Sequence, residues 1–137
     1  MADDDLNRAT IVPLPARPGL RRVFVRNYTA QARIGVWDHE KQAPQPVRIS
    51  VDLSVLENGP HHGDELDGVV CYQDVVDTID FILAGGHIQL VETLAERIAE
   101  QTLCDRRVVS VRVMVEKTTA VDGADSVGVE IERHRRA

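Results

Sequence analysis

The period at which apolar residues recur changes twice along the chain, and this change limits the folds open to it. In VRISVDLSV (47–55) every second residue is apolar, which is typical of a strand with one buried face. Residues 72–84 and 90–103 instead space their apolar side chains three and four apart, as amphipathic helices do. The alternation of a strand is found in three further segments: 21–37, 108–117 and 125–133.

Each predicted element presents one set of apolar side chains to a common core. Apolar and polar residues alternate most regularly in the second half of the first strand. The first helix is expected to end at Gly85 and Gly86, because glycine adopts the left-handed conformation of a helix cap with little strain. The side chains predicted to face inward are Ala30, Ala32, Ile34 and Val36; Val47, Ile49, Val51, Leu53 and Val55; Val75, Ile79, Ile82 and Leu83; Leu90, Val91, Leu94, Ala95, Ile98, Ala99 and Leu103; Val109, Val111, Val113 and Val115; Val127, Val129 and Ile131.

The resulting order, ββααββ, predicts an α+β domain with a four-stranded antiparallel sheet and two helices on one face. The polar, proline-punctuated stretch DHEKQAPQP (38–46) is the expected connection of the first hairpin. Such a sheet has two free edges, and proteins cover, blunt or pair their edges. We therefore expect copies of the chain to assemble through their strands.

The length of 137 residues suits one domain. Residues 1–20 combine three aspartates with three prolines and are expected to form a flexible arm, which leaves 21–137 as the domain. The chain has no apolar run long enough to span a bilayer, and its acidic beginning does not resemble a secretory signal. We therefore expect a cytoplasmic protein.

Charge and metal-ligand spacing argue against two classes of function. A net charge of −6 disfavours a dedicated nucleic-acid binder, and we interpret the C-terminal RHRR as a solvated end. Cys71 and Cys104 lack CxxC spacing and suit a reducing compartment, while the adjacent His61 and His62 are poorly placed to chelate a metal. We expect neither a metal nor a cofactor.

Glu92 lies in the first turn of the second predicted helix, beside its apolar stripe. A carboxylate there profits from the helix dipole whether it faces water or a ligand. Position alone favours a solvated carboxylate.

Four segments, taken in order, resemble the dihydroneopterin aldolase family: IGVWDHEKQAPQPVRISVDL (34–53), VVCYQDV (69–75), LVETLAERIAE (90–100) and VMVEK…DSVGVEIER (113–133). The resemblance covers nearly all of 22–133 and implies the tunnelling fold. In that family four sheets join edge to edge into a sixteen-stranded barrel, two barrels stack into a homo-octamer, and active sites lie between subunits.

The resemblance also implies an activity. The family is a metal-independent aldehyde lyase of folate biosynthesis that performs a retro-aldol cleavage of 7,8-dihydroneopterin. The products are 6-hydroxymethyl-7,8-dihydropterin and glycolaldehyde. The C=N unit of the dihydropterin takes up the electrons, so the resemblance implies a pterin ligand and neither a metal nor a Schiff base.

Four polar residues acquire roles from this resemblance. Glu92 would anchor the pterin, because one carboxylate accepts two adjacent N–H donors. Lys117 would remove a proton from the side-chain hydroxyl of the substrate, and partial burial would assist it by disfavouring the ammonium. Tyr72 would relay the proton that is added to the enamine intermediate. Glu40 would act from a neighbouring subunit and hold Lys117 or a water in place. The expected walls of the pterin slot are Val70, Cys71 and Val91.

Two departures from the family pattern leave alternatives open. Where typical aldolases carry YHG, this chain has RIG at 33–35. The segment after Lys117, KTTAVDGADSV, is short and lacks prolines, which is more like the dihydroneopterin triphosphate epimerases. Those enzymes invert C2′, and Arg33 is the only local candidate to meet a triphosphate. A 2′-epimerase and a non-catalytic oligomeric paralogue therefore stay open beside the aldolase that we favour.

Overall fold

The structure, a computed structural model, describes residues 19–57 and 64–136. The predicted flexible arm, residues 1–20, lies almost entirely outside this part of the chain. Of the arm only Gly19 and Leu20 are described, and Leu20 already begins the first strand.

The four strands form one antiparallel sheet in sequence order. They are β1 (Leu20–Ala32), β2 (Gln45–Leu56), β3 (Val108–Lys117) and β4 (Val127–His134). The predicted ββααββ order and the four-stranded antiparallel sheet are therefore confirmed. Strands β1 and β4 are the edges of this sheet within a single chain.

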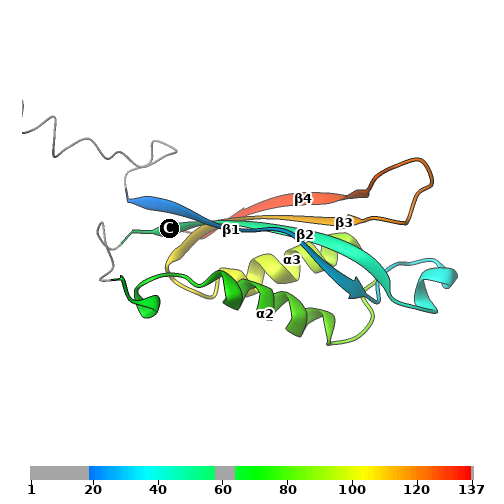
Figure 1. Ribbon diagram of the computed structural model, residues 1–137, viewed down its shortest axis with the longest axis horizontal. Coiled ribbons are helices and arrows are strands. Elements are labelled where there is room, and N and C mark those ends of the chain that lie inside the picture. Colours follow the sequence, from blue (N-terminus) through cyan, green and yellow to red (C-terminus); the bar gives the residue numbers. More distant parts are fainter. Residues whose placement is uncertain (1–18, 58–63, 137) are drawn as a thin grey trace, which may run out of the picture.

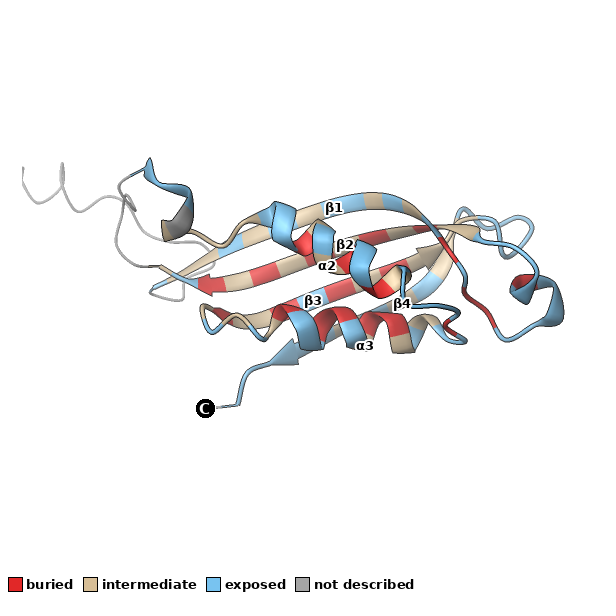
Figure 2. Cartoon of the chain, turned by 90° about the horizontal axis from the view of Figure 1, so that it is seen from below, coloured by how far each residue is buried: buried red, intermediate tan, exposed pale blue. Residues whose placement is uncertain are grey.

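Both helices, α2 (Tyr72–Leu83) and α3 (Val91–Thr102), cover the same face of the sheet (Figure 1). Their buried side chains recur at helical spacing, and Figure 2 shows buried residues (red) alternating with exposed ones along both helices. Two short 3-10 helices, η1 (Asp38–Lys41) and η3 (Leu66–Gly68), lie in the connections. Within the described residues, no helix is long and apolar enough to cross a membrane.

The core fills the space between the helices and the inner face of the sheet. Leu53 in β2, Ile79 in α2 and Ile98 in α3 are fully buried. Each such side chain contributes about 1.5–3 kcal/mol through burial. Other core residues with almost no exposure include Ile34, Val47, Ile49, Val51, Ile88, Leu94, Ala95, Ala99, Val108, Val111, Val113 and Val115.

The first strand ends earlier than its alternation predicts. Strand β1 stops at Ala32, because Gly35 turns the chain with a backbone φ of 131° that favours glycine. Ile34 remains buried through a parallel bridge to Ile88, whereas Val36 is exposed, so the prediction that Val36 faces the core is wrong.

The predicted inward face of β3 is also wrong at its first position. A bulge shifts the register so that Ser54 pairs with Ser110 but Val55 pairs with Val108. Val108 is therefore buried in place of Val109, which is only half-buried. Alternation predicts the inward face only where the pairing is regular.

The C-terminal basic residues 133–136 are exposed, as expected of a solvated end, and two of them also contact the rest of the domain. The Arg133 guanidinium donates to the carboxylate of Glu96 on α3. Arg135 donates to the carbonyl of Leu103 just after α3, and to those of Asp105 (2.9 Å) and Val108 (3.0 Å). Helix C-termini carry unpaired carbonyls and negative partial charge, so an arginine there is well placed.

The two ends of the sheet carry different parts of the chain. At the end called here the Lys117 end, Ala32 pairs with Gln45 and Val47 pairs with Lys117. The Tyr72 end is the opposite one, where β2 stops and β3 starts. Figure 1 draws η1 (cyan) at the Lys117 end and η3 (green) at the Tyr72 end.

Candidate active site

Glu40 is a charged residue buried by a local turn. It lies in η1, where its N–H donates to the carbonyl of Trp37 at 2.9 Å. Its Oε1 in turn accepts the N–H of Trp37 at 3.3 Å, which folds the carboxylate back on the chain. Gly35 makes room for it, because a Cβ at this position would lie 2.2 Å from Glu40 Cδ.

Glu40 and Lys117 form an ion pair at the Lys117 end. Lys117 Nζ lies 2.6 Å from Glu40 Oε2, and their side chains are only 16% and 6% exposed. The pair lies within one chain, so the expectation that Glu40 reaches Lys117 from a neighbouring subunit is wrong. The reason is register, because Lys117 pairs with Val47 at the start of β2, just after the η1 connection.

Gln45 is a site residue that the sequence reasoning missed. Its Nε2 donates to Glu40 Oε2 at 2.9 Å and lies 2.8 Å from the carbonyl oxygen of Ile34. It therefore fixes the carboxylate against the end of β1. The sequence pattern carries no signal for it, because Gln45 is placed there by the pairing of Val47 with Lys117, which the structure shows.

The environment of Glu40 holds it in its charged form. Burial alone would raise the pKa of this carboxyl. Hydrogen bonds from Lys117, Gln45 and the N–H of Trp37 outweigh burial and lower the pKa of Glu40 to about 2. Glu40 is therefore a carboxylate at neutral pH, held 2.6 Å from an amine that can exchange a proton with a bound hydroxyl.

Glu92 and Val91 begin α3 at the same end of the sheet. The bridge between Ile34 and Ile88 fixes the linker before α3 against the segment that leads to Glu40. The side chain of Glu92 is exposed, and no hydrogen bond to it is found in the described part of the chain. Its acceptor oxygens are therefore available to a ligand, and Val91 lies half-buried beside it.

Val70, Cys71 and Tyr72 lie at the Tyr72 end, so a single chain does not bring them to Lys117. Val70 and Cys71 line a small cavity together with Val108, the first residue of β3. Tyr72 begins α2 and is 65% exposed. The seven predicted site residues therefore form two groups, one at each end of the sheet.

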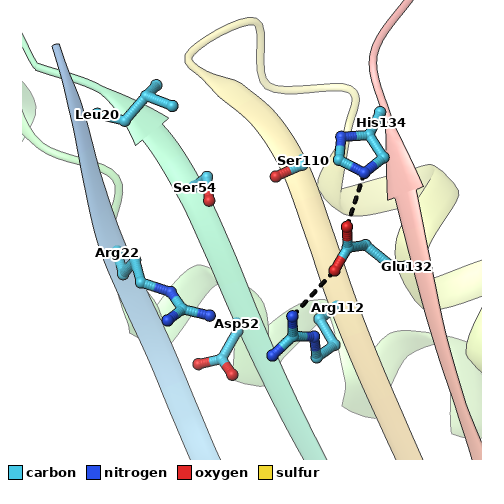
Figure 3. Close-up of a pocket in the computed structure, with 8 residues that line it drawn as sticks. All are labelled: Leu20, Arg22, Asp52, Ser54, Ser110, Arg112, Glu132 and His134. Atoms are coloured by element: carbon cyan, nitrogen blue, oxygen red, sulfur yellow. Dashed lines mark hydrogen bonds and ion pairs between the residues drawn. The ribbon is translucent and has the colours of Figure 1, made fainter. Parts of the chain in front are cut away.

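A separate cavity of about 300 Å³ opens on the sheet face away from the helices (Figure 3). Arg112 donates to one Glu132 oxygen at 3.0 Å, and His134 lies 2.7 Å from the other. These charged groups pair with one another, and none of the predicted site residues is among those that line the cavity. The remaining lining residues are Leu20, Arg22, Asp52, Ser54 and Ser110.

The sequence offers few residues for metal or phosphate binding, namely the adjacent His61 and His62, and Arg33. Among residues 19–57 and 64–136, no group of three or more His, Cys, Asp or Glu side chains could hold a metal ion. His61 and His62 lie outside the described residues. Arg33 is exposed, just before the turn at Gly35. Ser126, which ends the short connection after β3, donates to Glu116 at 2.6 Å.

Comparisons with known proteins identify the family of this chain. A family model described as dihydroneopterin aldolase matches residues 23–132. The dihydroneopterin aldolase of Streptomyces coelicolor is 33% identical over 116 residues, which are 83% of this chain and 98% of that protein.

Two solved structures are similar over most of the chain. The dihydroneopterin aldolase from Burkholderia thailendensis, bound to guanine, has a TM-score of 0.77 at 35% identity and covers 90% of this chain and 98% of its own. That of Escherichia coli, in complex with neopterin, has a TM-score of 0.77 at 29% identity and covers 82% and 98%. On the family model and these relatives, the chain belongs to the dihydroneopterin aldolase family.

Proposed function

We propose that this chain is the dihydroneopterin aldolase of folate biosynthesis, a lyase that cleaves 7,8-dihydroneopterin. The products are 6-hydroxymethyl-7,8-dihydropterin and glycolaldehyde. The observation that carries the proposal is the buried Glu40–Lys117 pair, supported by Gln45, at an end of the sheet that also presents the free carboxylate of Glu92. A packing role alone requires none of these polar groups.

The reaction begins with proton removal from the C2′ hydroxyl of the substrate. Lys117, in its neutral amine form, accepts this proton directly or through a water, and the resulting ammonium pairs with the carboxylate of Glu40. The C1′–C2′ bond then breaks, its electron pair passes into the C=N unit of the dihydropterin, and C2′ leaves as the aldehyde carbon of glycolaldehyde. Tyr72 delivers the proton that converts the resulting enamine at C1′ into the hydroxymethyl product.

Glu92 fixes the orientation of the pterin ring in this proposal. Its exposed carboxylate accepts the two adjacent N–H donors of the amino-pyrimidinone edge. Val91 beside it, with Val70 and Cys71, supplies apolar walls for a flat ring. The structures of relatives bound to guanine and to neopterin support a ligand with such an edge.

We further propose that each active site is built from two chains of a homo-octamer. Tyr72 and Lys117 lie at opposite ends of the sheet in one chain, and the edge strands β1 and β4 are free to pair with other copies. A cytoplasmic location is part of the proposal, supported by the two free cysteines, Cys71 and Cys104.

The first experiment is product analysis after purified protein is incubated with 7,8-dihydroneopterin and EDTA. We expect 6-hydroxymethyl-7,8-dihydropterin and glycolaldehyde. Appearance of the C2′ epimer alone would assign the chain to the second candidate, a 2′-epimerase, which the short segment after Lys117 favours. An unchanged substrate and no pterin binding would leave the third candidate, a paralogue without the chemistry.

The two-chain site has its own test. Lys117→Ala and Tyr72→Phe are each expected to lose most turnover as pure proteins. When the two variants are co-expressed in equal amounts, about one quarter of the sites combine an intact Lys117 with an intact Tyr72. Recovered activity of that order supports the shared site, and no recovery from co-purified mixed oligomers contradicts it.

A further inference from the structure

The segment that carries the contacts of Glu40 is held by the linker that precedes α3. The N–H of Gly35 donates to the carbonyl of Ile88 at 3.0 Å, and the N–H of Ile88 donates to that of Arg33 at 2.9 Å. Glu92 follows Ile88 by four residues, in the first turn of α3. The backbone therefore joins the catalytic pair and the proposed pterin anchor at this point.

One side chain reinforces this junction. His87 Nε2 lies 2.7 Å from the carbonyl oxygen of Gly35. A carbonyl only accepts hydrogen bonds, so Nε2 must carry a proton.

Gly35 is therefore held from two sides. The His87 ring binds its carbonyl, while the side chain of Glu40 fills the space where a Cβ would otherwise lie. In the described part of the chain, His87 makes the only side-chain hydrogen bond between the α2–α3 linker and the segment from Arg33 to Gln45. Movement of Gly35 would move Glu40 relative to the start of α3.

We propose that His87 is a positioning residue of the lyase, which sets the distance between the Glu40–Lys117 pair and the Glu92 carboxylate through the carbonyl of Gly35. This inference rests on the proposed function, because it assumes one substrate that contacts both the Glu40–Lys117 pair and Glu92. Glu92 holds the ring, Lys117 must meet the hydroxyl on the side chain, and a misplacement of about 1 Å between them can cost about 10²-fold in rate.

The test compares three variants in the intact protein. His87→Ala removes the donor, His87→Gln retains an N–H donor, and Gln89→Ala alters an exposed neighbour in the same linker. We expect kcat of His87→Ala to fall about 10-fold or more while its affinity for neopterin changes less than about 3-fold. His87→Gln should recover most of the loss, and Gln89→Ala should match the wild type.

Two kinetic outcomes would overturn the proposal. One is a normal kcat in His87→Ala, which would make the contact dispensable. The other is a parallel loss of neopterin affinity and kcat that His87→Gln does not relieve, which would indicate general damage to the linker.

Amide hydrogen exchange at Gly35 and Ile88 gives a measurement that does not depend on activity. We expect faster exchange at both amides in His87→Ala and unchanged exchange in Gln89→Ala. If the wild type lacked lyase activity, the proposed function would fail, and this measurement would still test whether His87 holds the junction. Unchanged exchange in His87→Ala would refute the link itself.

Discussion

The pH dependence of stability gives a direct test of the buried pair of Glu40 and Lys117. The proposed perturbation is Glu40→Gln, which keeps the shape of the side chain and removes its titration. In the wild type, hydrogen bonds from Lys117, Gln45 and the Trp37 N–H outweigh the effect of burial and hold the pKa of Glu40 at about 2, against an ordinary value of 4.5. A pKa lowered by that amount corresponds to about 3 kcal/mol of stability.

The sign follows from the direction of the pKa change. Because the pKa of Glu40 is lower in the folded chain, its contribution is fully present above pH 4.5 and is lost as the pH falls toward 2. By pH 3, about 2 kcal/mol of the contribution should be gone. The other carboxylates titrate alike in wild type and variant, so the difference in free energy of unfolding between the two proteins isolates Glu40.

Urea unfolding of both proteins from pH 7 to pH 3, at one fixed protomer concentration, measures this difference. The fixed concentration matters because assembly contributes to the stability of an oligomer. A difference between the proteins that stays constant across this range would refute the pairing described here.

Lys117→Met supplies a control in which the contribution of Glu40 to the free energy of unfolding changes with pH in the opposite direction from the wild type. It leaves a buried carboxylate without its cation, at a cost of about 3–5 kcal/mol near neutral pH. That cost should shrink on acidification, because protonation of Glu40 removes the unpaired charge. If the free energies of unfolding of Lys117→Met and Glu40→Gln depended on pH in the same way, the Glu40 carboxylate would not be the titrating group.

Three further predictions concern the site. Lys117→Ala should retain neopterin binding and lose most turnover. Equilibrium binding measures the first effect and steady-state kinetics the second. Glu92→Gln should weaken neopterin binding by about 10-fold or more, since it loses one of two charge-assisted hydrogen bonds, and normal affinity would remove its anchoring role. Gly35→Ala should lose about 1–3 kcal/mol of stability in urea, because φ is 131° and the new Cβ would lie 2.4 Å from Glu40 Cβ.

Hydrophobic periodicity predicted the fold well because one face of nearly every element is buried. Strand β3 has the predicted bounds of 108–117, and α2 and α3 each differ from prediction by two residues or fewer. The errors at Val36 and Val109 share a cause. In both places a local backbone irregularity, a glycine turn or a bulge, changes which side chain faces inward, and alternation carries no signal for it.

The site was less predictable because its geometry depends on contacts between distant segments. Glu40, Lys117 and Glu92 were identified by resemblance, yet Gln45 and His87 were not, since each acts through a carbonyl of the 33–37 segment. The acceptors are the backbone carbonyls of Ile34 and Gly35, and residue type does not predict which carbonyls accept such bonds. The turn after β1 positions both acceptors, and the alternation of apolar residues does not predict that turn.

The separation of Tyr72 from Lys117 follows from the order of the elements. Helices α2 and α3 form an antiparallel pair on one sheet, so their first turns must lie at opposite ends. A helix of twelve residues is about 18 Å long, and a rearrangement of a loop cannot close that gap. If Tyr72 and Lys117 act on one substrate, as proposed, they must therefore come from different copies. Within residues 19–57 and 64–136, β1 and β4 are the edges of the sheet, and pairing at these edges is the route by which we propose that two copies meet.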